Sequence, residues 1–187
     1  MAKQIIKTTS SQMVEQFLER NGLHKKDFAQ MIGVTLSYVY NLIDNAMPFS
    51  TRTVTLERIA TVMEVKPENF EEYKIPQEPI LIDKNVEMIK GILKSKKMST
   101  VNFLKAFPRN KRLEMVDILR GALPLPIDYK QLNMIGQILG MSKDEIFNIW
   151  SERIKQVLSL NGMDIYGNST LIDAMLECAQ KVNKDKI

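Results

Sequence analysis

Apolar residues along this chain recur mostly at helical spacing, with little of the strict alternation that indicates strands. The first predicted helix covers residues 10–18, and a hydroxyl of Ser10 or Ser11 is expected to cap it. Further helical stretches follow at residues 25–32, 36–44, 54–63 and, as a short helix, within 66–73. The pattern predicts an all-α fold.

Two prolines within four residues, Pro76 and Pro79, indicate an extended linker. Helical spacing resumes at Val86, and a last helical stretch covers residues 170–182. The apolar stripe of this last helix either forms an oligomerisation element or covers the core of the preceding domain. The predicted segments are a first helical domain at residues 8–75, a linker at 76–85, a second helical domain at 86–152 and C-terminal helices at 153–187.

The two helical domains repeat the same order of apolar positions. The stretch from Gly22 aligns with the stretch from Lys97, and after a one-residue insertion Leu56 aligns with Leu132. The loop sequences NAMP and GALP, each between matched helices, align as well. An internal repeat fixes architecture, and the alternative is that two helical segments align through shared amphipathicity alone.

The segment from Lys25 to Asp44 breaks a helix after two turns and restarts it at once. Gly33 suits a backbone geometry that is costly for other residues, and Thr35 is expected to cap the restarted helix. Val34 and Val39 are expected to hold the two helices together. Two short helices joined in this way make a helix-turn-helix, whose second helix can enter a DNA major groove.

Residues 22–70 resemble the phage Cro/repressor-type helix-turn-helix family, also called XRE-like. The matching features are Leu23, Phe28-Ala29, Gly33-Val34-Thr35, Val39, Leu42, Pro48, Leu56-x-x-Ile59-Ala60 and Val65. The chain departs from the family in a longer loop after residue 45, and in Leu36 and Tyr38 where polar or basic residues are common. The resemblance and the repeat together imply two lambda-repressor-like helix-turn-helix bundles in tandem, followed by a C-terminal helical segment.

The resemblance also implies sequence-specific DNA binding, usually as a dimer on a near-palindrome. The residues implied to contact bases are Leu36, Ser37, Tyr38, Tyr40 and Asn41. The residues implied to contact phosphates are Lys25, Lys26, Thr35 and Arg52. The two tyrosines could instead pack internally or form a protein interface, and the two lysines could be ordinary solvated side chains.

The positive charge lies outside this motif. Residues 1–75 hold nine basic and nine acidic side chains, whereas residues 76–153 hold thirteen basic and nine acidic ones. Because phosphate neutralisation supplies much of the affinity for DNA, the second repeat is predicted to contact DNA as well. The expected contacts are Thr100, Arg109, Asn110, Lys111 and Arg112, with Asn110 as the cap of the second recognition helix. The alternative is a degenerate copy that packs against the first repeat or a partner.

Residues that carry chemistry are few. The only histidine, His24, falls at the start of the second helix, and the only cysteine, Cys178, lies among apolar helix residues and is expected in a core. The chain has no phosphate-binding glycine loop and no nucleophile elbow, so we expect no enzyme, no metal site and no cofactor. It also has no apolar run of signal-peptide or membrane-spanning length, so a cytoplasmic protein is expected.

The sequence therefore predicts a DNA-binding transcriptional regulator, with a repressor from a phage or other mobile element favoured by family analogy. The expected partners are double-stranded DNA, further copies of the chain in a dimer or tetramer, and a protein antirepressor, with no membrane. One alternative is a protein-interaction module, such as an antirepressor or anti-defence protein, that reuses the fold. Another is a DNA-binding accessory factor of segregation or conjugation.

Overall fold

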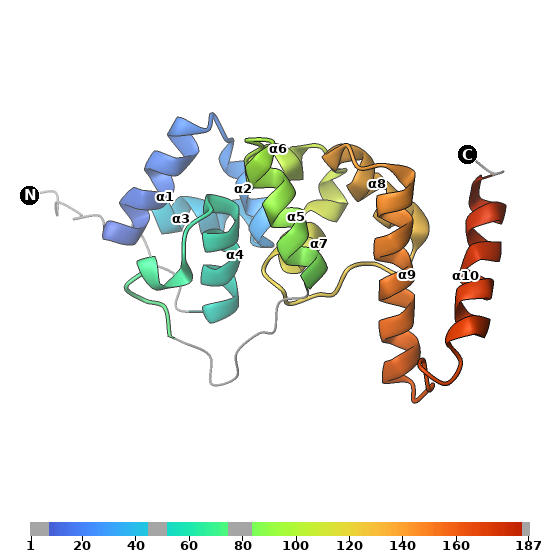
Figure 1. Ribbon diagram of the computed structural model, residues 1–187. Helices are drawn as coiled ribbons and strands as arrows, with labels where there is room; N and C mark the ends of the chain where they lie inside the picture. The colour runs from blue at the N-terminus through green and yellow to red at the C-terminus, as the bar shows by residue number, and fades with distance from the viewer. Residues whose placement is uncertain (1–7, 45–51, 75–83, 185–187) are drawn as a thin grey trace, which may run out of the picture. The chain divides into compact units, whose positions relative to one another are not determined.

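A computed structural model describes residues 8–44, 52–74 and 84–184, and every regular element in these ranges is a helix (Figure 1). This confirms the predicted all-α class. The loop with Pro48 and most of the predicted linker, including Pro76 and Pro79, lie outside the described residues. No helix in the described ranges is long and apolar enough to cross a membrane.

The helices fall into two compact units, residues 1–124 (unit 1) and 125–187 (unit 2). Unit 1 contains α1 (Thr9–Arg20), α2 (Lys25–Ile32), α3 (Leu36–Asp44), α4 (Thr53–Met63), the 3-10 helix η1 (Pro67–Asn69), α5 (Lys84–Ser95), α6 (Thr100–Lys105), the 3-10 helix η2 (Arg109–Lys111) and α7 (Arg112–Leu119). Unit 2 contains α8 (Tyr129–Leu139), α9 (Lys143–Leu160) and α10 (Ser169–Lys184). Which segments fold as independent domains stays a prediction.

The first four helices share one core. α2 packs on α3 and α4, and α1 packs on α3. Most of the apolar positions that predicted these helices are buried in this core, because each helix turns one apolar stripe inward. Val54, expected among the apolar positions of the fourth helix, is instead 45 % exposed. The fully buried members include Val14, Phe28, Ile32, Val39, Ile43, Leu56 and Ile59.

The predicted cap of α1 is wrong. Thr8 caps this helix, since its Oγ1 accepts from the backbone N–H of Ser11 at 3.2 Å. Ser10 and Ser11 lie inside the first turn and are buried. The Ser11 hydroxyl instead donates to the backbone carbonyl of Leu42 at 2.6 Å, so it ties α1 to the last turn of α3.

The helices after residue 84 follow the lengths of the first four. α1 to α4 have 12, 8, 9 and 11 residues, and α5 to α8 have 12, 6, 8 and 11. Left-handed backbone conformations recur at aligned positions: Gly22 (φ +53°) matches Lys97 (φ +51°), and Glu64 (φ +58°) matches Gly140 (φ +63°). The two left-handed pairs follow the same alignment as the apolar positions, including its one-residue insertion.

Unit 2 is built around the antiparallel pair α9 and α10, which lie side by side in Figure 1. Ile172 and Leu176 of α10 pack against Phe147 of α9, and an ion pair of 3.0 Å joins Lys155 to Asp173. Half of the α10 stripe thus covers a core within unit 2. Leu171 and Met175 are exposed, so the other half is open.

Candidate nucleic-acid interface

The turn between α2 and α3 has the predicted geometry. Gly33 is left-handed, with φ +72° and ψ +39°, and it ends α2. Thr35 caps α3, because its Oγ1 accepts from the backbone N–H of Tyr38 at 3.2 Å. Both predictions are confirmed. A residue with a Cβ is strained in this conformation, so glycine sets the direction in which the chain enters α3.

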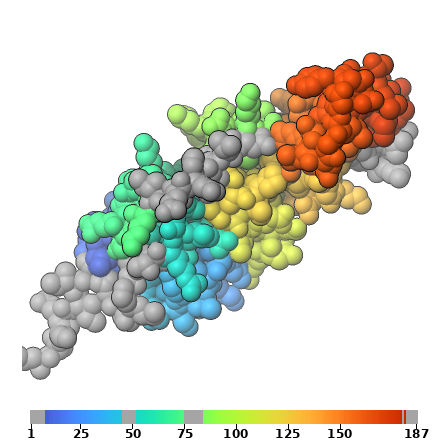
Figure 2. Space-filling view, turned by 90° about the horizontal axis from the view of Figure 1, so that it is seen from below, coloured from blue at the N-terminus to red at the C-terminus, as the bar shows by residue number. Residues whose placement is uncertain are grey.

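One side of α3 is buried and the other is open. Val39, Leu42 and Ile43 are at most 2 % exposed, whereas Leu36 is 39 % and Tyr40 is 45 % exposed. Figure 2 shows light-blue atoms from the stretch 25–44 at the surface of unit 1. Of the other residues implied to contact bases, Ser37 is exposed, and Tyr38 and Asn41 are half-buried. We call the side formed by Leu36, Ser37, Tyr38, Tyr40 and Asn41 the α3 face.

One cation, Lys25, lies next to the α3 face. The Lys25 ammonium, at the start of α2, lies 4.5 Å from the centroid of the Tyr40 ring, a cation–π distance. Lys26 is exposed beside it, and Arg52 is exposed at the cap position of α4. His24 occupies the cap position of α2, but its side chain makes no capping hydrogen bond.

α7 packs on α2 and α4, directly behind the turn. A Cβ added to Gly33 would lie 2.9 Å from both methyl carbons of Leu113, so α7 fills the space that the glycine leaves. Two arginines add ion pairs to α2: Arg112 lies 3.4 Å and Arg109 3.7 Å from the same Asp27 carboxylate oxygen. The turn is therefore held from behind while the α3 face stays open.

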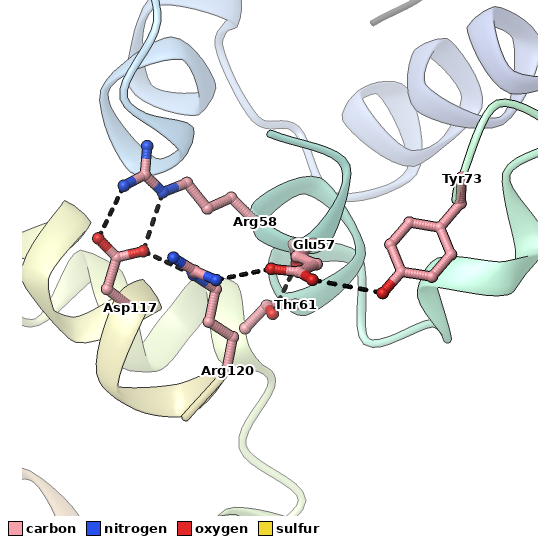
Figure 3. A network of polar contacts seen from close by, with 6 residues as sticks. All are labelled: Glu57, Arg58, Thr61, Tyr73, Asp117 and Arg120. Atoms are coloured by element: carbon pink, nitrogen blue, oxygen red, sulfur yellow. Dashed lines mark hydrogen bonds and ion pairs between the residues drawn. The ribbon is translucent and has the colours of Figure 1, made fainter. Parts of the chain in front are cut away.

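A chain of alternating charges reinforces the contact between α4 and α7 (Figure 3). Arg58 donates two hydrogen bonds to the Asp117 carboxylate, at 2.9 and 2.8 Å. Arg120 donates to Asp117 at 2.8 Å and to Glu57 at 2.6 Å, and Tyr73 donates to Glu57 at 3.3 Å. We call the four charged residues the α4–α7 network. Nothing in the sequence pattern revealed it, because its members are about 60 residues apart and each resembles an ordinary surface charge.

The network changes two pKa values. Burial alone would raise the pKa of the Asp117 carboxyl, but the hydrogen bonds and charges of Arg58 and Arg120 outweigh it and lower the pKa below the ordinary value. Burial, followed by the neighbouring Glu57 carboxylate, raises the pKa of the Tyr73 hydroxyl. Both groups therefore keep one protonation state across neutral pH, which suits a structural contact better than proton transfer.

The residues predicted to contact DNA from the second repeat have diverse surroundings. Thr100 is buried, and its backbone N–H donates to the Glu64 carboxylate. Lys111 pairs with Glu114 at 2.8 Å, and the Arg112 side chain, 11 % exposed, is held on Asp27. Arg109 and Asn110 are exposed in η2.

The predicted cap of α7 by Asn110 is wrong. α7 begins after the 3-10 turn, its cap position is Lys111, and no side chain caps it. A turn with Pro108 and without a left-handed residue leaves the chain in helical geometry up to α7, so no extended cap residue forms. α7 packs on α2 and α4, which is the arrangement expected under the alternative that the second repeat packs against the first.

The described residues contain no group of three or more His, Cys, Asp or Glu side chains placed to hold a metal ion. Cys178 is exposed on α10, so its predicted place in a core is wrong: it lies among apolar residues in the sequence, but the side of α10 that packs on the core carries Ile172 and Leu176.

A scan against protein-family models, a search of curated proteins and a search of solved structures each give no match to this chain. The resemblance to the Cro/repressor-type family therefore depends on the residues and the local geometry described above.

Proposed function

We propose that this protein binds double-stranded DNA through the α3 face and regulates transcription in a sequence-specific manner, most simply as a cytoplasmic repressor. The observation that carries the proposal is the open α3 face behind a left-handed glycine turn, with the Lys25 ammonium directly beside it. A duplex engaged by this face would meet polar groups at the bases and cations at the phosphates.

The fold that we propose is a tandem of two helix-turn-helix bundles followed by C-terminal helices. The matching helix lengths and the recurring left-handed positions support the repeat. The two repeats would have different roles, because α7 of the second repeat packs behind the Gly33 turn of the first repeat instead of facing outward. This brace, and not a second reader, is the role that we assign to α7.

The proposed DNA contacts follow from exposure and pairing. Base contacts are assigned to the α3 face, and phosphate contacts to Lys25, Lys26, Thr35, Arg52, Arg109 and Asn110. Arg109 is kept although it lies 3.7 Å from Asp27, because its side chain is 62 % exposed. Thr100, Lys111 and Arg112 are left out, because their groups are buried or are paired and less exposed. The exposed side of α10, with Leu171 and Met175, is the proposed contact between copies in a dimer or tetramer.

The experiment is a titration of the purified protein with the intergenic DNA beside its gene at several salt concentrations. Saturable binding in the nanomolar range, about a thousand-fold or more tighter than to unrelated DNA, supports a specific regulator. Lys25→Gln with Lys26→Gln should weaken binding and reduce the slope against log salt by about one for each lost phosphate contact. The matched control removes the same charge from unit 2, as Lys130→Gln with Lys143→Gln, and should leave the slope unchanged.

A protein-interaction module is the second candidate function, and one observation favours it. Leu36 and Tyr40 place apolar and aromatic surface on the α3 face. At the position of Leu36 the Cro/repressor-type family commonly has a polar or basic residue. Exposed aromatic and aliphatic side chains are typical anchors of protein interfaces. Binding to the intergenic DNA no tighter than to unrelated DNA, with an unchanged salt slope in the double lysine variant, would support this candidate.

A further inference from the structure

Unit 1 contains a cavity of about 970 Å³ on the side of α4 that faces α5. Its wall is formed by the last half of α4, η1, Tyr73, one side of α5, the start of α6 and the end of α7. Residues of α3 do not line it among the described residues, so the cavity is separate from the α3 face. The apolar part of the wall consists of Ala60, Val65, Pro67, Leu93, Met98 and Leu119.

The charged part of the wall is predominantly basic. Lys90 and Lys94 are four residues apart and lie on one side of α5, and Lys97 lines the cavity just after the helix ends. Lys66, which precedes η1, also lines the cavity. Within the ranges that the structure describes, none of these four ammonium groups makes an ion pair.

The acids of the wall are mostly committed elsewhere. Glu57 accepts from Arg120 and Tyr73, and Glu64 accepts from the backbone N–H of Thr100. Of the carboxylates on the wall, only Glu57 is neutralised by a cation of the described chain, Arg120, so Glu64 and Glu68 are left to oppose four lysines. The cavity therefore presents an excess of positive charge beside an apolar surface.

Burial lowers the pKa of the Lys90 ammonium, and the nearby Glu87 carboxylate opposes this shift without cancelling it. Lys90 as a residue is exposed, and its ammonium has no anionic partner strong enough to offset this effect of burial. A bound anion would supply that partner, which gives the site a physical reason to accept negative charge.

We propose that this cavity binds a small molecule with one anionic group and an apolar body. Lys90, Lys94 and Lys97 would hold the anionic group, and the apolar wall would cover the body. The volume is at the upper end of the range for small-molecule sites, and a mainly apolar lining with a few convergent charges is their usual chemistry. The proposal does not depend on DNA binding.

The bound molecule would contact α4 and the α5–α7 segment together. Because it binds only when both walls are in place, it would stabilise the packing of α7 behind the Gly33 turn by mass action.

The test uses calorimetric titration of the full chain with three probes that share a ten-carbon tail: decanoate, decanol and decyltrimethylammonium. We expect saturable binding of one decanoate per chain, about ten-fold or more tighter than decanol, which corresponds to roughly 1.4 kcal/mol. The cationic probe should bind more weakly still. Absence of saturable decanoate binding, or equal affinity for the alcohol or the cation, overturns the proposal, and neither result requires a variant.

The variants locate the site. Lys90→Gln with Lys94→Gln should abolish the preference for decanoate over decanol. The control, Lys84→Gln with Lys105→Gln, removes the same charge from exposed positions of α5 and α6 outside the cavity and should retain the preference. If both double variants lose the preference for decanoate equally, the total charge of the protein and not the cavity attracts the anion. If both retain the preference, decanoate binds outside the cavity. Either result overturns the proposal.

Discussion

Replacement of Asp117 by asparagine tests whether the α4–α7 network holds the two halves of unit 1 together. Asp117 accepts from Arg58 and from Arg120, and its side chain is 12 % exposed, against 20 % and 11 % for the arginines. Asparagine keeps the shape but removes the charge, and its amide nitrogen faces a guanidinium that it cannot pair with. Two largely desolvated cations are then left with one remaining anion, Glu57.

The expected cost follows from this burial. Removal of one partner from a buried ion pair destabilises a protein by roughly 3–5 kcal/mol. Partial exposure of the two arginines lets water reach them, so we expect a loss of about 2–4 kcal/mol in the free energy of unfolding. The matched control is Glu114→Gln, which breaks the pair with Lys111. Both of those side chains are 32 % exposed, and a solvated pair contributes about 0–1 kcal/mol.

The assay is urea unfolding followed by far-ultraviolet circular dichroism, with wild type and both variants compared at several pH values. The pKa of the folded Asp117 carboxyl is lowered, so its stabilising effect is complete above the unfolded value of about 3.9 and is lost as the pH falls below that value. The gap between wild type and Asp117→Asn should therefore be constant from pH 7 to about pH 5 and shrink below about pH 4. A gap at pH 7 no larger than that of Glu114→Gln would refute the reasoning.

Two further predictions concern the support of α3. Gly33→Ala should cost more stability than Gly22→Ala in thermal unfolding, because both positions are left-handed, at about 1–2 kcal/mol each, but only the Cβ at Gly33 would collide with Leu113; equal costs would show that α7 does not press on the turn. Ser11→Ala should lose about 1–3 kcal/mol, since the buried Leu42 carbonyl loses a hydrogen bond, whereas Ser37→Ala at the exposed surface should stay within about 0.5 kcal/mol; similar urea midpoints for the two variants would contradict this.

Local features of the first helices could be predicted from the sequence because neighbouring residues determine them. Gly33 sets the turn, Thr35 caps α3, and the apolar spacing gives most of the buried residues of α1 to α4, with Val54 as an exception. The predicted cap of α1 was wrong by two or three residues, because several neighbouring hydroxyls could cap this helix and the sequence does not show which of them bonds to another helix. The Ser11 hydroxyl donates to the Leu42 carbonyl, and the Thr8 hydroxyl caps α1.

The surroundings of the candidate site could not be predicted, because they depend on contacts between residues distant in sequence. The positive charge of the second repeat suggested a second DNA-binding surface, but Arg112 forms an ion pair with Asp27 of α2. Arg120 likewise forms an ion pair with Glu57 of α4. Charge counts along a chain do not reveal which cations a fold neutralises internally. For the same reason the cavity beside α5 had no sequence signal.

The most direct measurement of the central proposal is selection of duplex DNA from a random library by the wild-type protein and by Ser37→Ala with Asn41→Ala. We expect the wild type to enrich one motif and the double variant to lose that enrichment while its far-ultraviolet spectrum and unfolding midpoint stay close to those of the wild type. Failure of the wild type to enrich any motif, or enrichment of the same motif by the folded double variant, would contradict the assignment of base reading to the α3 face.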